Sequence, residues 1–412
     1  MHHAPAEAKF SPSSQEQGSM SSPVRKSVSA AAAGPPEVRG IGEAETFELV
    51  RRSAAPILAV GAERQSSACF CEGDRALLFR SVGDLMDPSV YRAFRAQIDA
   101  AARSASFSPA VIAHDLHPLY LSTHYARQAG LPLIAVQHHH AHIASVMAER
   151  RHPGPVLGIC CDGIGFGDDG AAWGCEIMYC TASEYLRTGH LEYFPLLGGD
   201  AAAIDTWRSA FALVQQAVGR CEDLAPFERV PADQMDVMRR LSRTEINAPP
   251  TSSLGRVFDG VSFLLGLCDH NDRPAQAAMA LERIALAEPV SPYPYQTTVG
   301  RDGVLMSLAP MIRAIVRDVT RAEDPRVISA RFHETVARML AAAAQISAER
   351  NAISTVVLSG GCFANRLLRD QTRALLERRR FAVLLPERSP VGDAGIALGQ
   401  AVVATARLEG GR

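Results

Sequence analysis

Residues 156–179, VLGICCDGIGFGDDGAAWGCEIMY, decide the fold of this chain. An apolar run (Val156–Cys161), a Gly- and Asp-rich segment (Asp162–Gly170) and a second apolar run (Ala172–Tyr179) follow one another. This order predicts a buried strand, a turn and a returning strand. A similar pattern lies about a hundred residues earlier, in the short apolar runs Ile57–Val60, Cys69–Cys71 and Ala76–Phe79. We therefore expect a duplicated α/β unit.

Strands and helices are expected to alternate on both sides of this segment. Before it, the pattern predicts a helix, a strand, a helix and a strand at 90–102, 110–113, 119–129 and 133–136. After it we expect a helical block (207–285), a long helix (328–350), and then strand, helix, strand and helix at 355–358, 362–380, 382–385 and 393–407. Such alternation favours a mainly parallel sheet covered by helices.

The domain organisation follows from these elements and from composition. Residues 1–45 are rich in Ser, Ala, Pro and Gly and are expected to form a disordered tail. Residues 46–155 would form a first lobe and 156–412 a second, with a helical insertion at about 200–290. The last helix is a candidate to pack back on the first lobe.

Composition excludes several classes of function. The chain has 412 residues and a net charge of only −2, with no broad basic face for nucleic acid. Its nine cysteines include no Cys-x-x-Cys pair of a structural zinc site, and they suggest reduced thiols in the cytoplasm. No apolar run approaches the ~20 residues of a membrane span.

The strongest candidate site begins at the sequence His138-His139-His140-Ala141-His142, which follows a predicted strand and opens a helix. Residues four apart share a helix face, so His138 and His142 can bind one ion. Asp162 at a strand end and Asp393 at a helix start can complete a set that suits Fe, Zn or Mn, with Mg as a further candidate. The alternative is a cluster of hydrogen-bonded surface histidines.

Two glycine-rich segments are candidate anion sites. Asp162–Gly170 would let backbone amides approach phosphate, although an ordinary hairpin uses glycines in the same way. Leu358–Asn365 combines a strand, two glycines and a helix start, which makes either an anion seat or a tight turn. Cys362 is interpreted as a core residue because no histidine partner is evident. Arg208 and Arg256 would hold a phosphate or form ion pairs.

Together these motifs resemble the C-terminal, TsaD-like carbamoyltransferase portion of the hydrogenase maturation protein HypF. The resemblance extends from about Ile57 to Ala404. It rests on an ordered series of segments: His114–Pro118, Tyr120–Thr123, Gln137–Ser145, Asp162–Glu176, Gly198–Asp200, Trp207–Arg208, Thr251–Asp259, Ser359–Leu368 and Gly392–Gln400.

The resemblance implies duplicated RNase H-like lobes of the actin type (ASKHA), with a helical insertion in the second lobe. It implies transfer of a carbamoyl group from carbamoyl-adenylate, derived from carbamoyl phosphate and ATP, to the C-terminal cysteine of HypE, for synthesis of the cyanide ligand of NiFe hydrogenase. The catalytic metal ligands would be His138, His142, Asp162 and Asp393. The nucleotide-binding residues would be Ser253, Gly255, Asp259, Gln276, Gly360, Gly361 and Asn365.

The sequence also departs from the family pattern. The acylphosphatase-like, zinc-finger and YrdC-like domains of full-length members have no counterpart here, so the resemblance implies a separate protein that supplies the adenylate. Four short motifs also differ. The family's Asn-Asp-Gly-Gly is replaced by Gly392–Gly395, and Tyr-Glu-Gly-Gln by Arg273–Gln276. Arg-Glu-Pro is replaced by Ile204–Thr206, and Glu-Leu-Lys-Asn by Glu63–Ser66. These changes favour, as an alternative, a degenerate HypF-like scaffold that binds maturation factors. An O-carbamoyltransferase for a small metabolite is a third alternative, ranked last because the segments His114–Thr123 and Thr251–Asp259 look more like HypF.

Overall fold

The computed structural model describes residues 44–410 except 222–223, 245 and 302. The disordered tail expected for residues 1–45 therefore lies outside the described residues, apart from its last two positions. Those two, Ala44 and Glu45, begin a strand, β1 (Ala44–Glu48).

The first sheet has six strands in the order β1-β4-β3-β2-β5-β6. Strands β2, β3 and β4 form an antiparallel meander, and β5 and β6 continue from β2 in parallel. The bounds are β2 (Ile57–Ala59), β3 (Cys69–Glu72), β4 (Arg75–Phe79), β5 (Val111–Asp115) and β6 (Leu133–Val136). Three helices belong to this part of the chain: α1 (Pro88–Ala105), α2 (Leu121–Gln128) and α3 (His138–Glu149).

The second sheet repeats this arrangement. Its central strands are β7 (Val156–Phe166), β8 (Ala172–Cys180), β9 (Tyr185–Leu191), β14 (Thr355–Ser359) and β15 (Ala382–Leu384). Strands β7, β8 and β9 form an antiparallel meander, and β14 and β15 continue from β7 in parallel. The hairpin of β12 (Gln296–Gly300) and β13 (Gly303–Ser307) extends the sheet beyond β9, while the short β10 (Phe194–Pro195) and β11 (Pro250–Thr251) lie off the main path.

The two sheets share one strand order, since β4-β3-β2-β5-β6 corresponds to β9-β8-β7-β14-β15. In both, parallel strands are joined through helical crossovers, as such sheets require. The predicted duplicated α/β fold is therefore confirmed.

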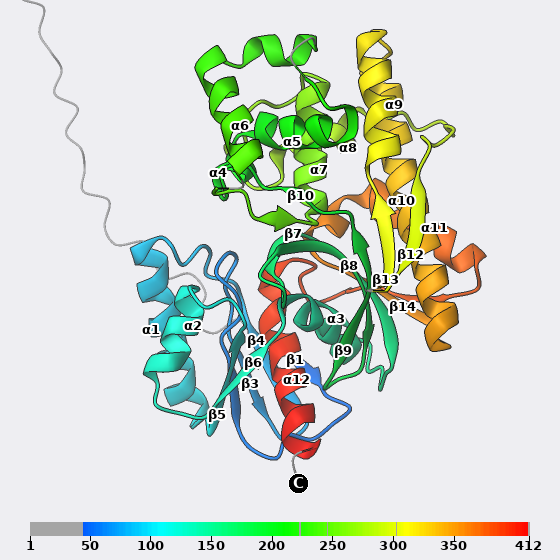
Figure 1. The fold of residues 1–412 in the computed structure, drawn as a ribbon. Helices are drawn as coiled ribbons and strands as arrows, with labels where there is room; N and C mark the ends of the chain where they lie inside the picture. Colours follow the sequence, from blue (N-terminus) through cyan, green and yellow to red (C-terminus); the bar gives the residue numbers. More distant parts are fainter. Residues whose placement is uncertain (1–43, 222–223, 245, 302, 411–412) are drawn as a thin grey trace, which may run out of the picture. The chain divides into compact units, whose positions relative to one another are not determined.

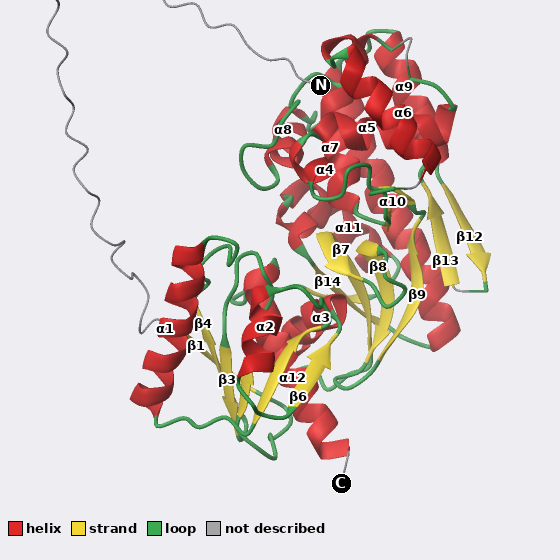
Figure 2. Cartoon of the chain, turned by 60° about the vertical axis from the view of Figure 1, so that its left-hand side comes forward, coloured by secondary structure: helices red, strands yellow, loops and turns green. Residues whose placement is uncertain are grey.

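Helices between β9 and β14 form a block whose members pack on one another (Figure 2). They are α4 (Ala201–Ile204), α5 (Thr206–Val218), α6 (Ala232–Thr244), α7 (Leu254–Leu264) and α8 (Gln276–Ile284). Helices α9 (Ala309–Thr320) and α10 (Pro325–Asn351) share the same core cluster. Within the described residues, no helix combines the length and hydropathy that crossing a membrane requires.

Two helices pack closely between the sheets. The last helix, α12 (Ile396–Gly410), lies beside α3 (Figure 1) and contacts β2 to β6 of the first sheet, whereas α3 contacts β7, β8 and β14 of the second. Gly399 makes this packing possible, because a Cβ there would overlap the carbonyl oxygen of Ala141. The start of α3 and the segment before α12 are therefore brought together.

The turn predicted at Asp162–Gly170 is wrong over its first half. Strand β7 continues to Phe166, and β8 begins at Ala172. The turn is therefore formed only by residues 167–171. Between the pairs Cys161↔Cys175 and Gly165↔Trp173 the register shifts, so residues 162–164 lie opposite the single residue Gly174. This bulge bends the strand without ending it.

The helix predicted directly after Gly361 begins later than expected. Residues Gly361–Ala364 form a single 3-10 turn, and α11 spans Arg366–Arg378. Asn365 separates the two because its backbone is extended (φ −65°, ψ 108°) and its side chain accepts from the Leu368 amide. Asn365 is therefore the N-cap that starts the new helix.

Candidate metal centre

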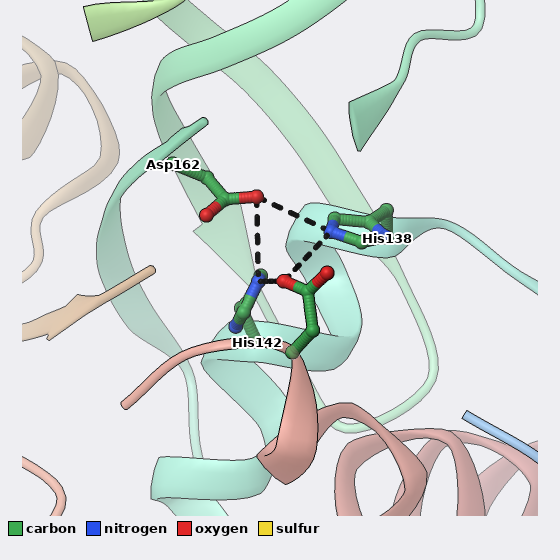
Figure 3. A group of neighbouring side chains, drawn as sticks. His138, His142 and Asp162 are labelled. Atoms are coloured by element: carbon green, nitrogen blue, oxygen red, sulfur yellow. Dashed lines mark ion pairs between the residues drawn. The ribbon is translucent and has the colours of Figure 1, made fainter. Parts of the chain in front are cut away.

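Four side chains from three parts of the chain converge. His138 and His142 come from the first turns of α3, Asp162 from the bulge of β7, and Asp393 from a 3-10 turn (Asp393–Gly395) just before α12. Figure 3 shows both imidazoles directed toward the carboxylate of Asp162. One ligand atom from each of the four residues lies within 4.8 Å of the others.

The closest approaches are those of two imidazole nitrogens to two carboxylates. Nε2 of His138 lies 3.4 Å from Asp162 and 3.8 Å from Asp393, and Nε2 of His142 lies 3.8 Å and 3.6 Å from the same two residues. Separations of this size between ligand atoms are compatible with metal–ligand bonds of about 2.0–2.2 Å to one shared ion. The predicted set of four residues is thus brought together.

Asp115, to which the sequence interpretation gave no role, holds His138 from behind. Its Oδ2 lies 2.8 Å from Nδ1 of His138, and its Oδ1 accepts from the backbone amide of His117. Asp115 ends β5, whose parallel neighbour β6 leads directly into α3. A carboxylate behind a ligating imidazole fixes its ring and leaves the other nitrogen free to bind metal.

The Asp162 carboxylate is also held in place by the chain. The backbone amide of Gly361 donates to its Oδ1 at 3.0 Å, which leaves Oδ2 facing the histidines. Further along β7, Gly165 lets α3 approach, since a Cβ there would lie 2.7 Å from Cδ2 of His138. The bulge and the glycines therefore place this carboxylate against α3.

Charge interactions within the group are strong because water is largely excluded. Burial alone would raise the pKa of Asp162, but contacts with His138 and His142 outweigh it and hold that pKa well below its usual range. Burial likewise opposes protonation of His138, yet Asp115 and Asp162 raise its pKa well above the ordinary value. The pKa of His142 is also raised, mainly through Asp162 and Asp393. The carboxylates thus favour a positive charge at this position.

The orientation of the histidines fits a metal better than hydrogen bonding. Nε2 of His138 and Nε2 of His142 are both buried, and neither has a hydrogen-bond partner among the described residues. Buried nitrogens without a partner are costly unless something else binds them. Two imidazole nitrogens and two carboxylates suit Fe, Zn or Mn. The residues therefore fit the divalent ion that the sequence predicted.

Asp393 is positioned by contacts on either side of it. Ser67 donates to the carbonyl of Ala394 at 2.8 Å. The carboxylate of Glu149, at the end of α3, accepts from the backbone amides of residues 387–389 and from the hydroxyl of Ser389. Asp393 is the most exposed of the four ligand candidates, with 21% of its side chain accessible. The centre is therefore open to solvent mainly at this residue.

Four of the residues predicted to bind nucleotide lie next to the bulge. The hydroxyl of Ser253 donates to the carbonyl of Gly163, and Gly255 faces the Cα of the same residue. Gly360 packs on the backbone of Cys161 in a left-handed conformation (φ 97°) that favours glycine. Together with Gly361 these residues border Asp162.

The other predicted nucleotide contacts are occupied by the chain itself. Asp259 is buried, and its oxygens contact Arg256 at 2.6 Å and Asn271 at 3.1 Å. Asn365 contacts His333 through Nδ2 and caps α11 through Oδ1. Gln276 accepts from the amide of Asp272 at the start of α8.

The amides that follow the candidate anion seat Leu358–Asn365, in the first turn of α11, are bound by side chains of the chain itself. The amides of Arg366 and Leu367 donate to the carboxylate of Glu282, and that of Leu368 donates to Asn365. Burial raises the pKa of the Cys362 thiol well above its usual range, so this thiol stays protonated. Arg208 pairs with Asp205, as Arg256 does with Asp259.

Two family models match the chain. Residues 158–400 match the second subdomain of the carbamoyltransferase Kae1-like domain, and residues 52–149 match the HypF Kae1-like domain. The chain belongs to the HypF family. The match confirms the resemblance inferred from the motifs and, with it, the duplicated RNase H-like fold of the actin type.

Curated relatives of HypF support the assignment. A carbamoyltransferase HypF homolog of Cupriavidus necator is 38% identical over 364 residues, which cover 85% of this chain and 91% of that protein. Carbamoyltransferase HypF2 of the same organism is 35% identical, covering 86% of this chain and 47% of the relative. HypF of Rhodobacter capsulatus is 37% identical, covering 87% of this chain and 48% of the relative. The chain thus spans about half the length of the latter two.

Solved structures of HypF share the fold. A full-length HypF in a phosphate- and nucleotide-bound form superposes with a TM-score of 0.85 at 35% identity, over 89% of this chain and 57% of that one. HypF of T. kodakarensis gives a TM-score of 0.78 at 27% identity, over 89% of this chain and 49% of that protein.

Proposed function

We propose that this HypF-family chain is a metal-dependent carbamoyltransferase of hydrogenase maturation. It would transfer the carbamoyl group of carbamoyl-adenylate to the C-terminal cysteine of HypE. The observation that carries the proposal is the convergence of His138, His142, Asp162 and Asp393 within 4.8 Å, in a chain of this family. The absence of disulfides among its nine cysteines is consistent with a cytoplasmic location, which belongs to the same proposal.

In the proposed reaction a carbon–sulfur bond forms and the anhydride carbon–oxygen bond breaks. AMP leaves with the electron pair of that bond, and the thiol proton of the cysteine passes to solvent. An ion held by the four side chains would supply Lewis-acid polarisation of the carbamoyl carbonyl. Asp115 keeps Nε2 of His138 directed into the centre, and the amide of Gly361 does the same for one oxygen of Asp162.

The nucleotide would lie beside the bulge of β7, near Ser253, Gly255, Gly360 and Gly361. Two observations support this part of the proposal. These residues border Asp162, and a HypF of the same fold has been solved with phosphate and nucleotide bound. Asp259, Asn365 and Gln276 would join the site after exchanging their present partners for the nucleotide.

A transfer assay tests the proposal. The metal-loaded chain is mixed with carbamoyl-adenylate and HypE, and the mass of the HypE C-terminal peptide is measured. We expect one carbamoyl group on the terminal cysteine, and none when His142→Ala replaces the wild type. A chain that binds metal and nucleotide but leaves the cysteine unmodified would contradict transferase activity.

A second candidate is a HypF-like scaffold that binds maturation factors without turnover. It is favoured by one observation: Asp259 and Asn365 are engaged by the chain's own Arg256, Asn271 and His333. The two functions differ in their dependence on the metal centre. HypE binding that persists in the His138→Ala variant, together with no transfer by the wild type, would favour the scaffold.

A further inference from the structure

An aromatic stack in the loop between β5 and α2 lies beside Asp115, which holds His138 and accepts from the amide of His117, and it has no part in the function proposed above. The ring of His117 stacks on that of Tyr120, with centroids 4.0 Å apart and planes at 14°. The ring of Phe166, at the end of β7, lies nearly perpendicular to the same imidazole, with centroids 5.2 Å apart and planes at 77°. Tyr120 packs against the core cluster that contains Ile396, the first residue of α12. The stack thus links the end of β7 to the core that the first sheet shares with α3 and α12.

Each ring of this stack carries one hydrogen-bond donor. The backbone amide of Leu119 donates to Nδ1 of His117 at 3.3 Å, so the ring proton is on Nε2. Among the described residues, neither this Nε2 nor the hydroxyl of Tyr120 has a hydrogen-bond partner. The loop that carries them is accessible, since Leu119 between them is 72% exposed. Two donors on neighbouring, stacked side chains are therefore left without a partner from the described part of the chain.

Burial and the nearby carboxylates determine the protonation state of both groups. Burial raises the pKa of Tyr120 well above its usual range, and the carboxylates of Asp115, Asp393, Asp162 and Glu63 raise it further. The hydroxyl therefore keeps its proton. Burial lowers the pKa of His117, so this imidazole is neutral. The four carboxylates repel a ligand anion. Its binding here therefore requires hydrogen-bond donors that are not already bound to another group of the chain.

We propose that His117 and Tyr120 together bind a phosphate oxygen of the acyl donor, as an uncharged donor pair at the edge of the metal centre. This inference rests on the proposed function, because it assigns the pair to the phosphate of the adenylate. The donated bonds are of the charge-assisted kind, which are stronger than neutral ones. Bringing the phosphate here would place the neighbouring carbamoyl group next to the four candidate metal ligands.

Binding of two nucleotide probes tests the pair. AMP carries the phosphate and adenosine lacks it, so their affinities for the metal-loaded chain are measured by calorimetry. Tyr120→Phe removes the hydroxyl and keeps the ring, and His117→Phe removes the donor and keeps the stack. Tyr125→Phe, in the helix α2 that directly follows the stack, is the matched control because its ring packs on Phe94.

Each donor variant should weaken AMP binding about tenfold, as expected for loss of a hydrogen bond to a charged group. Adenosine binding, metal affinity and thermal stability should stay unchanged, and Tyr125→Phe should match the wild type. Equal losses for AMP and adenosine, or no loss at all, would overturn the proposal. So would a wild type that binds AMP no more tightly than adenosine. A chain that shows the AMP effect but fails the HypE assay would contradict the transferase function and leave the donor pair intact.

Discussion

Nδ1 of His138 lies 2.8 Å from a carboxylate oxygen of Asp115, and both side chains are completely buried. This contact determines which nitrogen of His138 faces Asp162 and Asp393. The metal centre therefore depends on a residue that does not face it.

Asp115→Asn should lower the affinity for a divalent ion by about 10- to 100-fold, the usual cost of losing a partner behind a ligating histidine. The amide keeps the shape of the side chain but removes the charge that orients the ring. Calorimetric titration of the metal-free variant with Zn²⁺ or Mn²⁺ measures the effect. Asp99→Asn, on the exposed side of α1, is the control and should bind as the wild type does; equal affinities for all three proteins would contradict the role of Asp115.

Removal of metal should destabilise the wild type and leave a ligand variant unaffected. An ion at a hundred times its dissociation constant stabilises the folded state by about 2.7 kcal/mol. Thermal unfolding with and without a chelator should therefore show a lower Tm for the chelated wild type and no shift for His142→Ala. A chelator effect of the same size in both proteins would indicate a different metal site.

Gly165→Ala should disturb the centre, whereas Gly163→Ala should not. A Cβ at Gly165 would lie 2.6–2.7 Å from the rings of His139 and His138, while a Cβ at Gly163 meets no atom within 4 Å. Overpacking of this kind costs about 1–3 kcal/mol. Denaturant unfolding and metal titration of the two variants, which differ by two positions in one strand, compare the effects directly. The prediction fails if the two alanines have equal consequences.

Stability should fall as the pH drops from about 6.5 to 4. Burial lowers the pKa of His333 to about 4, so in this range the unfolded chain binds a proton that the folded chain does not. Between pH 6.5 and 5, titration of His333 lowers the free energy of unfolding by about 2 kcal/mol. This follows from a pKa of about 4 in the folded chain and the ordinary value of 6.5 in the unfolded chain. His140, whose pKa burial also lowers to about 4, acts in the same direction.

Denaturant unfolding at pH 7 and pH 5 measures this loss. The His333→Gln variant should be less stable than the wild type at pH 7, because it disturbs the contacts with Ser329 and Asn365, but its stability should change less with pH. A wild type and variant with the same pH dependence would show that His333 does not titrate in this way.

The local sequence predicted the four candidate ligands but did not predict Asp115, which holds one of them in place. Spacing along a helix predicted that His138 and His142 share a face, and strand and helix ends suggested Asp162 and Asp393. Asp115 contacts His138 only because β5 and β6 pair in parallel, with Asp115 opposite Val136. A carboxylate at the end of a strand beside the one that precedes the histidines was the available signal.

The fold was predictable where strands are apolar and less so elsewhere. β12, with the sequence QTTVG, is mostly exposed, so it shows no apolar run. The bulge at 162–164 was interpreted as a turn because its glycines and aspartates are typical of turns. Only pairing with β8 on both sides of the bulge keeps this segment within the strand.

Metal stoichiometry tests the central claim most directly. The metal-free chain and its Asp393→Ala variant are titrated with a divalent ion by calorimetry, and both are checked for folding by circular dichroism. We predict one tight ion per wild-type chain and loss of that binding in the folded variant. Unchanged stoichiometry and affinity in Asp393→Ala would show that these four side chains do not form the metal centre.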